Sequence, residues 1–207
     1  MIYNKSLIGS RFKYCSFDNF KLLSEKHKSA LDACDKMLHG ETDCVVLTGP
    51  VGRGKTHLLV SLARAYNQDT LYSLPEGRDC VYIDDPGNMV VFWPFRELSS
   101  AIRSAVMDGS LSVIVEDCQE CDLLVIDDLT AENITPFVVS TVEQIIEARY
   151  NNEAPIAISS NLSLDDIKDV YGPRIVSRLV DMSGKDCIVF LDADEDYRLK
   201  MHRERNG

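Results

Sequence analysis

The chain has 207 residues, with 22 Lys and Arg against 33 Asp and Glu, which gives a formal net charge of −11. Its length and its hydrophobic fraction of 45% predict a single globular domain that needs no disulfide or metal, and they exclude disordered and collagen-like classes. Because no apolar run approaches the ~20 residues that span a bilayer, and the N-terminus lacks the apolar core of a secretory signal, a cytoplasmic protein without a membrane partner is expected.

Helix-like and strand-like segments alternate along the chain. The helix-like segments carry apolar residues at helical spacing, and the strand-like ones are short runs rich in Val, Ile and Leu, typical of strands buried on both faces of a sheet. In chain order they are helix 24–38, strand 44–48, helix 55–66, strand 80–84, helix 94–107 with Pro94 at its first position, strand 122–127, helix 136–150, strand 155–159 and strand 187–191. This order predicts an α/β fold, a parallel sheet with helices on both faces.

A phosphate-binding motif follows the first predicted strand directly. Residues 49–56 read GPVGRGKT, which fits G-x-x-x-x-G-K-[S/T] between a strand and a helix. Glycines let backbone N–H groups surround a phosphate, and the helix that begins there points its positive end at the same place. We expect Lys55 to reach the terminal phosphates and Thr56 to bind Mg²⁺. The predicted nucleotide-binding residues are Gly49, Pro50, Val51, Gly52, Arg53, Gly54, Lys55, Thr56 and His57.

Two carboxylates follow the third predicted strand, in the sequence LLVIDDL of residues 123–129. The strand carries Asp127 to the carboxyl edge of the sheet, beside the phosphate loop, where it is predicted to attend Mg²⁺. Asp128 is predicted to face the attacking water as a base, because adjacent side chains of a strand point in opposite directions. The competing reading is a solvated Asp-Asp turn after a strand.

Polar and basic residues follow the fourth predicted strand. Asn161 is predicted to bond the terminal phosphate or the lytic water, although capping of the next helix by Ser163 competes as an explanation for part of this run. Arg174 and Arg178 are four residues apart on a predicted helix and therefore share a face. They either stabilise phosphoryl transfer in a neighbouring subunit or form salt bridges to local Asp residues.

The seven cysteines are an odd number, which does not suggest a disulfide framework. Cys118 and Cys121 have the spacing of a zinc knuckle, but no second Cys or His pair with suitable spacing follows them. A structural role is favoured over a metal or redox role, because reduced Cys behaves as a small hydrophobe.

Several segments together resemble a known family: SFDNF (16–20), GPVGRGKTHL (49–58), LLVIDDL (123–129), AISSNLS (157–163) and YGPRIVSRL (171–179). They are similar to the AAA+ ATPases of the bacterial replicative helicase-loader group, of DnaC and DnaI type, and to the IstB transposition ATPases. The resemblance implies an AAA+ P-loop NTPase with a five-stranded parallel sheet ordered 5-1-4-3-2 and no C-terminal lid domain. It also implies an N-terminal extension over 1–15, an ATPase domain over 16–192 and a basic tail over 193–207.

The same resemblance implies roles for single residues. Thr56 and Asp127 would attend Mg²⁺ beside ATP, and Asp128 stands where most AAA+ enzymes have Glu. Asn161 matches the residue called sensor 1. The resemblance further assigns Arg178 as the arginine finger inserted into a neighbouring subunit, Arg174 as its companion, and Phe17 and Phe20 as an aromatic box near the adenine, with core packing as the other reading for the two Phe residues.

By resemblance, the expected activity is slow ATP hydrolysis by a homo-oligomer that acts on a replicative DNA helicase. An IstB-like ATPase that assists a transposase is the alternative. A P-loop kinase for a small molecule is a third reading, but the chain offers neither an acceptor pocket nor an Arg-rich lid. Only about 15 residues precede the aromatic box, so a separate protein is expected to supply the family's helicase-docking domain, unless the chain is a minimal phage-type or mobile-element version.

The acidic balance weakens any expectation of tight DNA binding, which needs a basic face. The resemblance places Trp93 and Phe95 where family members have DNA-facing segments, which makes them candidates for weak contact with single-stranded DNA, and core packing is the competing reading for both. The locally basic residues, whose plainest reading is a solvated chain end, are Lys5, Arg11, Lys13, Arg198, Lys200, His202, Arg203 and Arg205.

Overall fold

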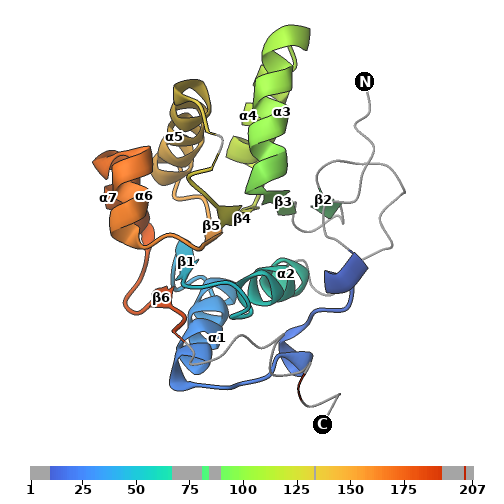
Figure 1. Ribbon diagram of the computed structural model, residues 1–207, viewed down its shortest axis with the longest axis vertical. Coiled ribbons are helices and arrows are strands. Elements are labelled where there is room, and N and C mark those ends of the chain that lie inside the picture. The colour runs from blue at the N-terminus through green and yellow to red at the C-terminus, as the bar shows by residue number, and fades with distance from the viewer. Residues whose placement is uncertain (1–9, 67–80, 84–89, 133, 193–202, 204–207) are drawn as a thin grey trace.

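The computed structural model describes residues 10–66, 81–83, 90–132, 134–192 and 203. The described residues form a six-stranded sheet in the order β2-β3-β4-β5-β1-β6. Helices α1 and α2 cover one face of the sheet, and the helices from α3 to α7 lie on the other (Figure 1). None of the helices in this part combines the length and apolar character needed to traverse a bilayer. The predicted α/β fold is confirmed.

Most strands lie where the apolar runs predict them. The strands are β1 (Cys44–Thr48), β2 (Val81–Ile83), β3 (Val90–Pro94), β4 (Leu123–Leu129), β5 (Ile156–Ser160) and β6 (Ile188–Phe190). Every residue of β1 and β5 is buried, as expected for central strands covered on both faces. The β3, β4, β5, β1 and β6 strands are parallel, and their order is the predicted one once β3 is counted as the second strand.

The prediction for the second strand is wrong in its residues. Val81–Ile83 forms only the outermost strand, and it runs antiparallel to β3. The position beside β4 belongs to Val90–Pro94, in which Val90 to Trp93 are all buried. A run of β-branched and aromatic side chains suits a strand that packs on both faces, which explains why VVFW takes the inner position. Cys80 and Asp84, the ends of the predicted strand, lie outside the described residues.

The helices follow the periodic segments, with one addition. They are α1 (Glu25–Leu38), α2 (Lys55–Tyr66), α3 (Phe95–Asp108), α4 (Leu111–Glu120), α5 (Pro136–Asn151), α6 (Leu164–Tyr171) and α7 (Pro173–Met182), preceded by the 3-10 turns η1 (Ser10–Phe12) and η2 (Phe17–Asn19). The hydroxyls of Ser24, Thr135 and Ser163 cap α1, α5 and α6. Pro94 ends β3 and precedes α3, so the prediction that it is the first helical residue is wrong.

Two apolar cores lie on the two faces of the sheet. Leu58 and Leu62 of α2 pack with Phe92 against one face, and Leu98 and Ile145 pack against the other. Trp93 and Phe95, the candidates for DNA contact, are 5% and 1% exposed and belong to the second core. Core packing is therefore their role, and the expectation of DNA contact is wrong for both.

The Cys118 and Cys121 thiols are buried and free at the end of α4, next to the guanidinium of Arg149. Within the described residues no cluster of His, Cys, Asp and Glu could hold a metal ion.

Arg149 has no exposed surface, and it donates hydrogen bonds of 2.9 Å to the carbonyl of Cys121 and 3.0 Å to that of Cys118. Its other nitrogens bond the carbonyl of Pro155, just before β5. The guanidinium thus satisfies the carbonyls that a helix end leaves unpaired.

Removing this guanidinium is expected to destabilise the fold. Arg149→Met leaves several buried carbonyls without donors, so it should lower the free energy of unfolding by about 3 kcal/mol or more. Arg64→Met is the matched control, because Arg64 is a partly exposed arginine whose described bond goes to a single carbonyl, and a change of about 0.5 kcal/mol or less is expected. Urea unfolding of both variants measures the difference. A loss below about 1 kcal/mol for Arg149→Met would contradict the assignment.

Candidate nucleotide-binding site

The phosphate loop, the acid pair and Asn161 meet around one cavity of about 440 Å³ at the carboxyl ends of β1, β4 and β5. The predicted residues that line it are Val51, Gly52, Arg53, Gly54, Lys55, Thr56, His57, Asp127, Asp128 and Asn161. Four further residues line it that were not predicted to bind the nucleotide: Arg11, Phe12, Cys15 and Ser159. Ligands bind at such strand ends in open α/β sheets, so the cavity lies where the topology predicts it.

Lys55 is 7% exposed and turns its ammonium group onto its own loop. Its Nζ donates to the carbonyls of Gly49 and Pro50, the latter at 2.8 Å, and to Oδ1 of Asn161, also at 2.8 Å. Gly49 and Pro50 do not line the cavity, so their part is to hold this lysine through backbone carbonyls. These neutral oxygens hold a buried ammonium group in the lining of the cavity, where its charge can attract an anion.

Gly49 is required by a close approach of two backbones. Its φ is +128°, and a Cβ on it would lie 2.5 Å from the carbonyl oxygen of Leu191. Gly49→Ala should therefore lower the free energy of unfolding by about 3 kcal/mol or more.

Gly109→Ala is the matched control for this prediction. Gly109 has a φ of +75° with nothing within 4 Å of its Cβ position, so only the backbone strain of about 1 kcal/mol applies. Thermal unfolding of both variants separates the close approach from the φ angle, and equal losses would contradict this explanation.

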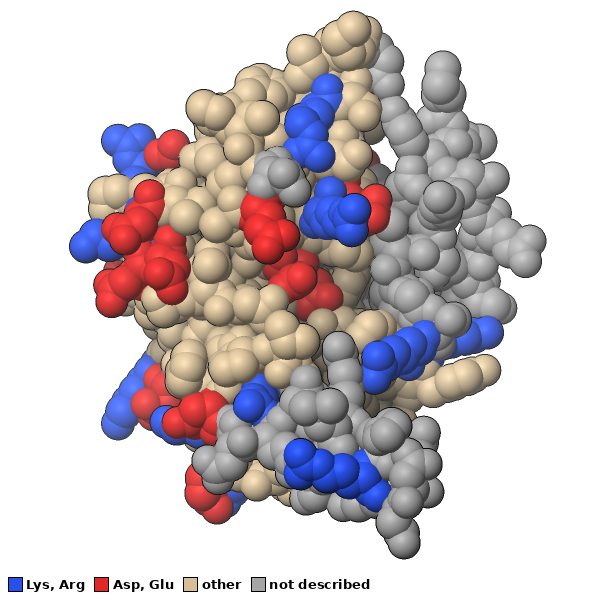
Figure 2. Space-filling view, in the orientation of Figure 1, with Lys and Arg blue, Asp and Glu red and all other residues tan. Residues whose placement is uncertain are grey.

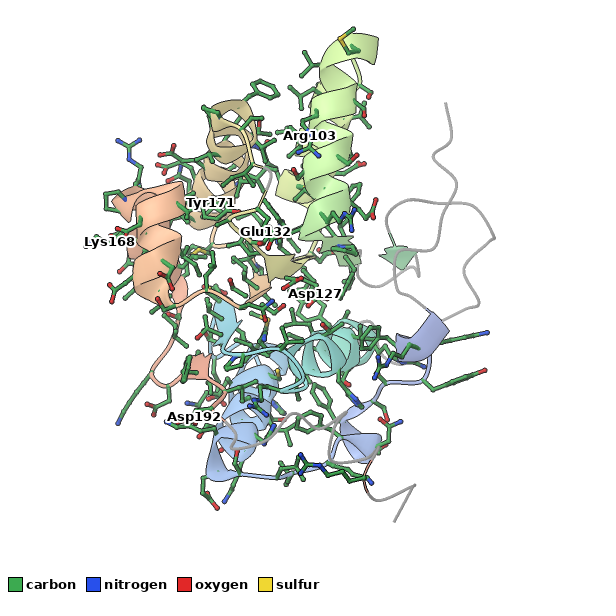
Figure 3. The ribbon with its side chains drawn as sticks, in the orientation of Figure 1. Arg103, Asp127, Glu132, Lys168, Tyr171 and Asp192 are labelled. Carbon is green, nitrogen blue, oxygen red and sulfur yellow. The ribbon has the colours of Figure 1, made fainter. Side chains whose placement is uncertain are left out.

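The two carboxylates of β4 have different surroundings. Asp127 is buried at the end of the strand, close to α2 (Figure 3), and its Oδ1 accepts hydrogen bonds from Ser159 Oγ at 2.6 Å and from Thr56 Oγ1 at 3.1 Å. Burial raises the pKa of Asp127, and these two hydrogen bonds oppose the shift. Asp128 is exposed, and its Oδ1 accepts a 2.7 Å hydrogen bond from Nδ2 of Asn161. Because Asp127 is buried and accepts two hydrogen bonds, it is not part of a solvated turn.

The oxygens of Thr56 and Asp127 fit a magnesium ion. Both supply hard oxygen ligands, they are hydrogen-bonded to each other, and they line the same cavity as Lys55. Mg²⁺ is bound by one or two protein oxygens together with phosphate oxygens and water, so these two residues suffice on the protein side.

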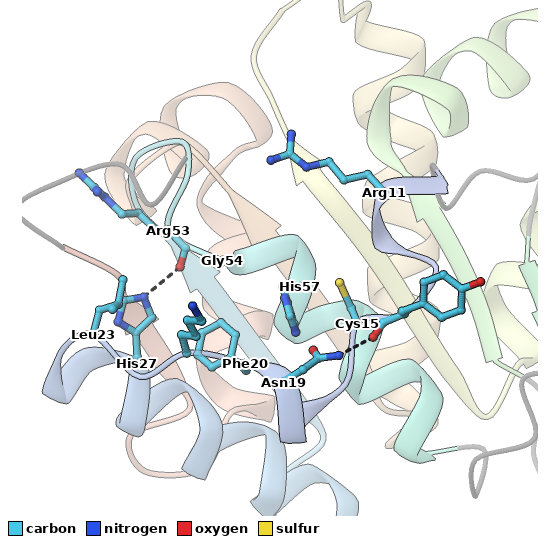
Figure 4. Close-up of a pocket in the computed structure, with 11 residues that line it drawn as sticks. Arg11, Cys15, Asn19, Phe20, Leu23, His27, Arg53, Gly54 and His57 are labelled. Carbon is cyan, nitrogen blue, oxygen red and sulfur yellow. Dashed lines mark hydrogen bonds between the residues drawn. The ribbon is translucent and has the colours of Figure 1, made fainter. Parts of the chain in front are cut away.

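A second cavity, of about 340 Å³, borders the first, and Figure 4 shows the residues that line it. The ring of Phe20 packs edge-on against His57, with 5.2 Å between centroids, and lies 5.5 Å from the ring of His27. Nε2 of His27 lies 3.1 Å from the carbonyl oxygen of Arg53, which ties α1 to the phosphate loop. The two cavities share the lining residues Arg11, Cys15, Arg53, Gly54 and His57.

The aromatic pair divides between two positions. Both rings pack against the core under α1 and α2, and Phe20 also lines the second cavity, whereas Phe17 lines neither cavity. Sequence reasoning did not place Arg11, Phe12 and Cys15 at the site, because they lie in and after a single 3-10 turn that has no periodic pattern. Arg11 is exposed, as the reading of a solvated basic end expects, and it also lines both cavities. Lys5 and the basic positions of the tail other than Arg203 lie outside the described residues.

The two arginines of α7 face α5 rather than either cavity. Nε and Nη2 of Arg178 donate to the two carboxylate oxygens of Glu147 at 2.6 and 2.7 Å, and the guanidinium lies 4.7 Å from the centroid of the Tyr150 ring. Arg174 lies 3.7 Å from Glu143 and is largely exposed. The two residues share a face as predicted, but their carboxylate partners are Glu residues of a neighbouring helix rather than local Asp residues.

Acidic side chains gather on the side of the molecule formed by α6 and α7 (Figure 2). The exposed carboxylates of α6 are Asp165, Asp166 and Asp169, and the exposed Lys168 lies among them. The carboxylates of α6 repel the phosphates of DNA, whereas the neighbouring α7 carries the exposed Arg174.

Residues 80–205, more than half of the chain, match the family described as IstB-like ATP binding protein. The chain belongs to this family. The matched range contains the acid pair, Asn161 and the arginines of α7. The phosphate loop precedes it, and this IstB-like chain also carries that loop in full.

Several known proteins are similar to this IstB-like chain in sequence or in fold. The replicative helicase loader DnaC of Escherichia coli (strain K12) is 21% identical over 182 residues, which cover 86% of this chain and 67% of that protein. A crystal structure of the DnaC helicase loader matches with a TM-score of 0.70 and 20% identity, over 88% of this chain and 99% of that chain. AMPPCP-bound DnaA from Aquifex aeolicus matches with a TM-score of 0.70 and 20% identity, over 92% of this chain and 54% of that one. The IstB-like chain therefore has the AAA+ fold.

Proposed function

We propose that this IstB-like protein hydrolyses ATP with Mg²⁺ and acts as a homo-oligomer on a replicative DNA helicase. One observation carries the enzymatic part of the proposal. A single cavity brings together a buried ammonium group, a hydroxyl and carboxylate pair, and a second carboxylate joined to an amide. These are the groups that bind a triphosphate, hold its metal ion and position a water molecule.

Phosphate binding, metal binding and proton acceptance fall to different residues of the chain. Backbone N–H groups of the phosphate loop and the Nζ of Lys55 bind the phosphates, and Thr56 and Asp127 hold the metal ion. When bound, Mg²⁺ neutralises charge on the phosphate oxygens. Asp128, which is exposed to the cavity, accepts a proton from the attacking water. Asn161 contacts both Lys55 and Asp128, so it links the phosphate end of the cavity to the base.

The position of Arg178 supports an oligomer. Phosphoryl transfer is accelerated by an arginine that neutralises the charge of the transition state, and Arg178 lines neither cavity of its own subunit. A neighbouring copy is therefore the source of this cation, with Arg174 beside it. The specific ATPase activity should rise with protein concentration, whereas a monomeric small-molecule kinase would show constant specific activity.

The similarity to DnaC supports a helicase as the partner. A pull-down with a replicative helicase, with and without ATP, tests this part, and nucleotide-dependent capture of the helicase is expected. Capture of a transposase instead would favour the IstB-like transposition role, which the family name supports.

The charge of −11 and the acidic surface over α6 support at most a weak contact with single-stranded DNA. We place this activity in the cytoplasm.

A further inference from the structure

Ser159, at the penultimate position of β5, contacts both members of the acid pair. Its Oγ donates a 2.6 Å hydrogen bond to Oδ1 of Asp127 and accepts a 2.8 Å hydrogen bond from the backbone N–H of Asp128. The side chain is 1% exposed. The one hydroxyl group therefore uses its donor on one acidic residue and an acceptor position on the next.

These two hydrogen bonds lie at a break in the sheet. Val125 and Ile126 of β4 pair with Ala157 and Ile158 of β5, but the next pair is Leu129 with Ser160, so β4 has one extra residue. Such a bulge re-aims side chains that a regular strand would place differently. Here Asp128 takes a φ of +59°, which is unfavourable for a residue other than Gly. The bond from its N–H to Ser159 replaces a ladder bond that the bulge removes.

We infer that Ser159 is a positioning residue of the site, whose hydroxyl group holds Asp127 toward Thr56 and Asp128 toward Asn161. The inference deepens the proposed ATPase function and rests on it. Because Oδ1 of Asp127 accepts bonds from both hydroxyl groups, the carboxylate is fixed from two sides. Outer hydrogen bonds of this kind orient the ligands of a metal ion, and their loss commonly costs 10- to 100-fold in metal affinity or activity.

Ser160 provides a matched control in the next position of the same strand. It is equally buried, and its Oγ donates to the carbonyl of Leu129 and accepts from the N–H of Leu162. It therefore makes the same kind of bonds without touching either carboxylate. A general effect on the strand would appear in both Ser159→Ala and Ser160→Ala, whereas an effect on the acid pair would appear in the first alone.

The test measures binding of a fluorescent ATP analogue to the full chain at increasing Mg²⁺ concentration. For Ser159→Ala, the Mg²⁺ concentration at half-maximal binding should rise about 10-fold or more, while affinity in EDTA stays at the wild-type value because Lys55 and its loop are intact. Ser160→Ala should match the wild type in both conditions. Ser159→Cys, which keeps the volume but weakens the bonds, should fall between them and serves if Ser159→Ala does not fold.

The outcomes separate the inference from the function on which it rests. A wild-type protein that responds to Mg²⁺, together with Ser159→Ala and Ser159→Cys variants that respond identically, would overturn the positioning role and leave the proposed function standing. A wild-type protein that takes up no nucleotide at any Mg²⁺ concentration would overturn both.

Discussion

Lys55→Ala is expected to lower the affinity for ATP by about 30- to 150-fold, because charge-assisted hydrogen bonds contribute about 2 to 3 kcal/mol. The Nζ of Lys55 is the one cation that the structure places, buried, directly on the phosphate loop within the described residues. The variant also frees Oδ1 of Asn161 from its bond to the lysine. Calorimetric titration with ATP measures the loss.

Lys36→Ala is the control for this variant. Lys36 bonds only the carbonyl of Lys185 among its described contacts, on the exposed side of α1, and lines neither cavity. Its affinity for ATP should equal that of the wild type. Unchanged affinity in Lys55→Ala would remove the main support for the proposed nucleotide site.

Arg178→Ala is expected to reduce ATP hydrolysis by about 10³-fold and to leave ATP affinity nearly unchanged. Arg178 does not line the cavity of its own subunit, so it does not contribute to ATP binding there. It acts only on the transition state in the cavity of a neighbouring copy. Steady-state ATPase assays and equilibrium binding measure the two quantities separately. Arg174→Ala should have a smaller effect, since Arg174 is more exposed and only loosely paired with Glu143.

A mixing experiment decides whether the cation is supplied between subunits. Lys55→Ala subunits keep Arg178, and Arg178→Ala subunits keep an intact phosphate loop, so each variant lacks what the other retains. The mixture should regain hydrolysis that neither variant shows alone. An inactive mixture of two well-folded variants, or full hydrolysis by Arg178→Ala, would remove the arginine finger from the mechanism.

Local features of the fold could be predicted from the sequence because their causes are local. The phosphate loop depends on residues 49–56 and their position between one strand and one helix, and the cap at Ser163 depends on the next three residues. The wrong second strand has a different origin. Residues 80–84 and 90–94 are both short apolar runs, and only burial against β4 decides between them.

Contacts between distant segments could not be predicted in the same way. The α4 helix was not predicted, and it is held at its end by Arg149, 28 residues after Cys121. Ser159 was counted only as part of a strand, since the sequence says nothing of the bulge that brings its hydroxyl group to Asp127 and Asp128. The pairing of Arg178 with Glu147 likewise joins two helices whose order the sequence shows but whose facing sides it does not.

The bidentate bridge between Arg178 and Glu147 makes any outside contact of this arginine an exchange reaction. An incoming group must offer two oxygen acceptors in the plane of the guanidinium and a negative charge, or the arginine stays with its carboxylate. Phosphate oxygens meet both conditions, whereas a lone carbonyl or a water molecule meets neither. Contact with a neutral surface therefore leaves Arg178 bonded to Glu147, and only a charged group with two oxygen acceptors replaces that carboxylate.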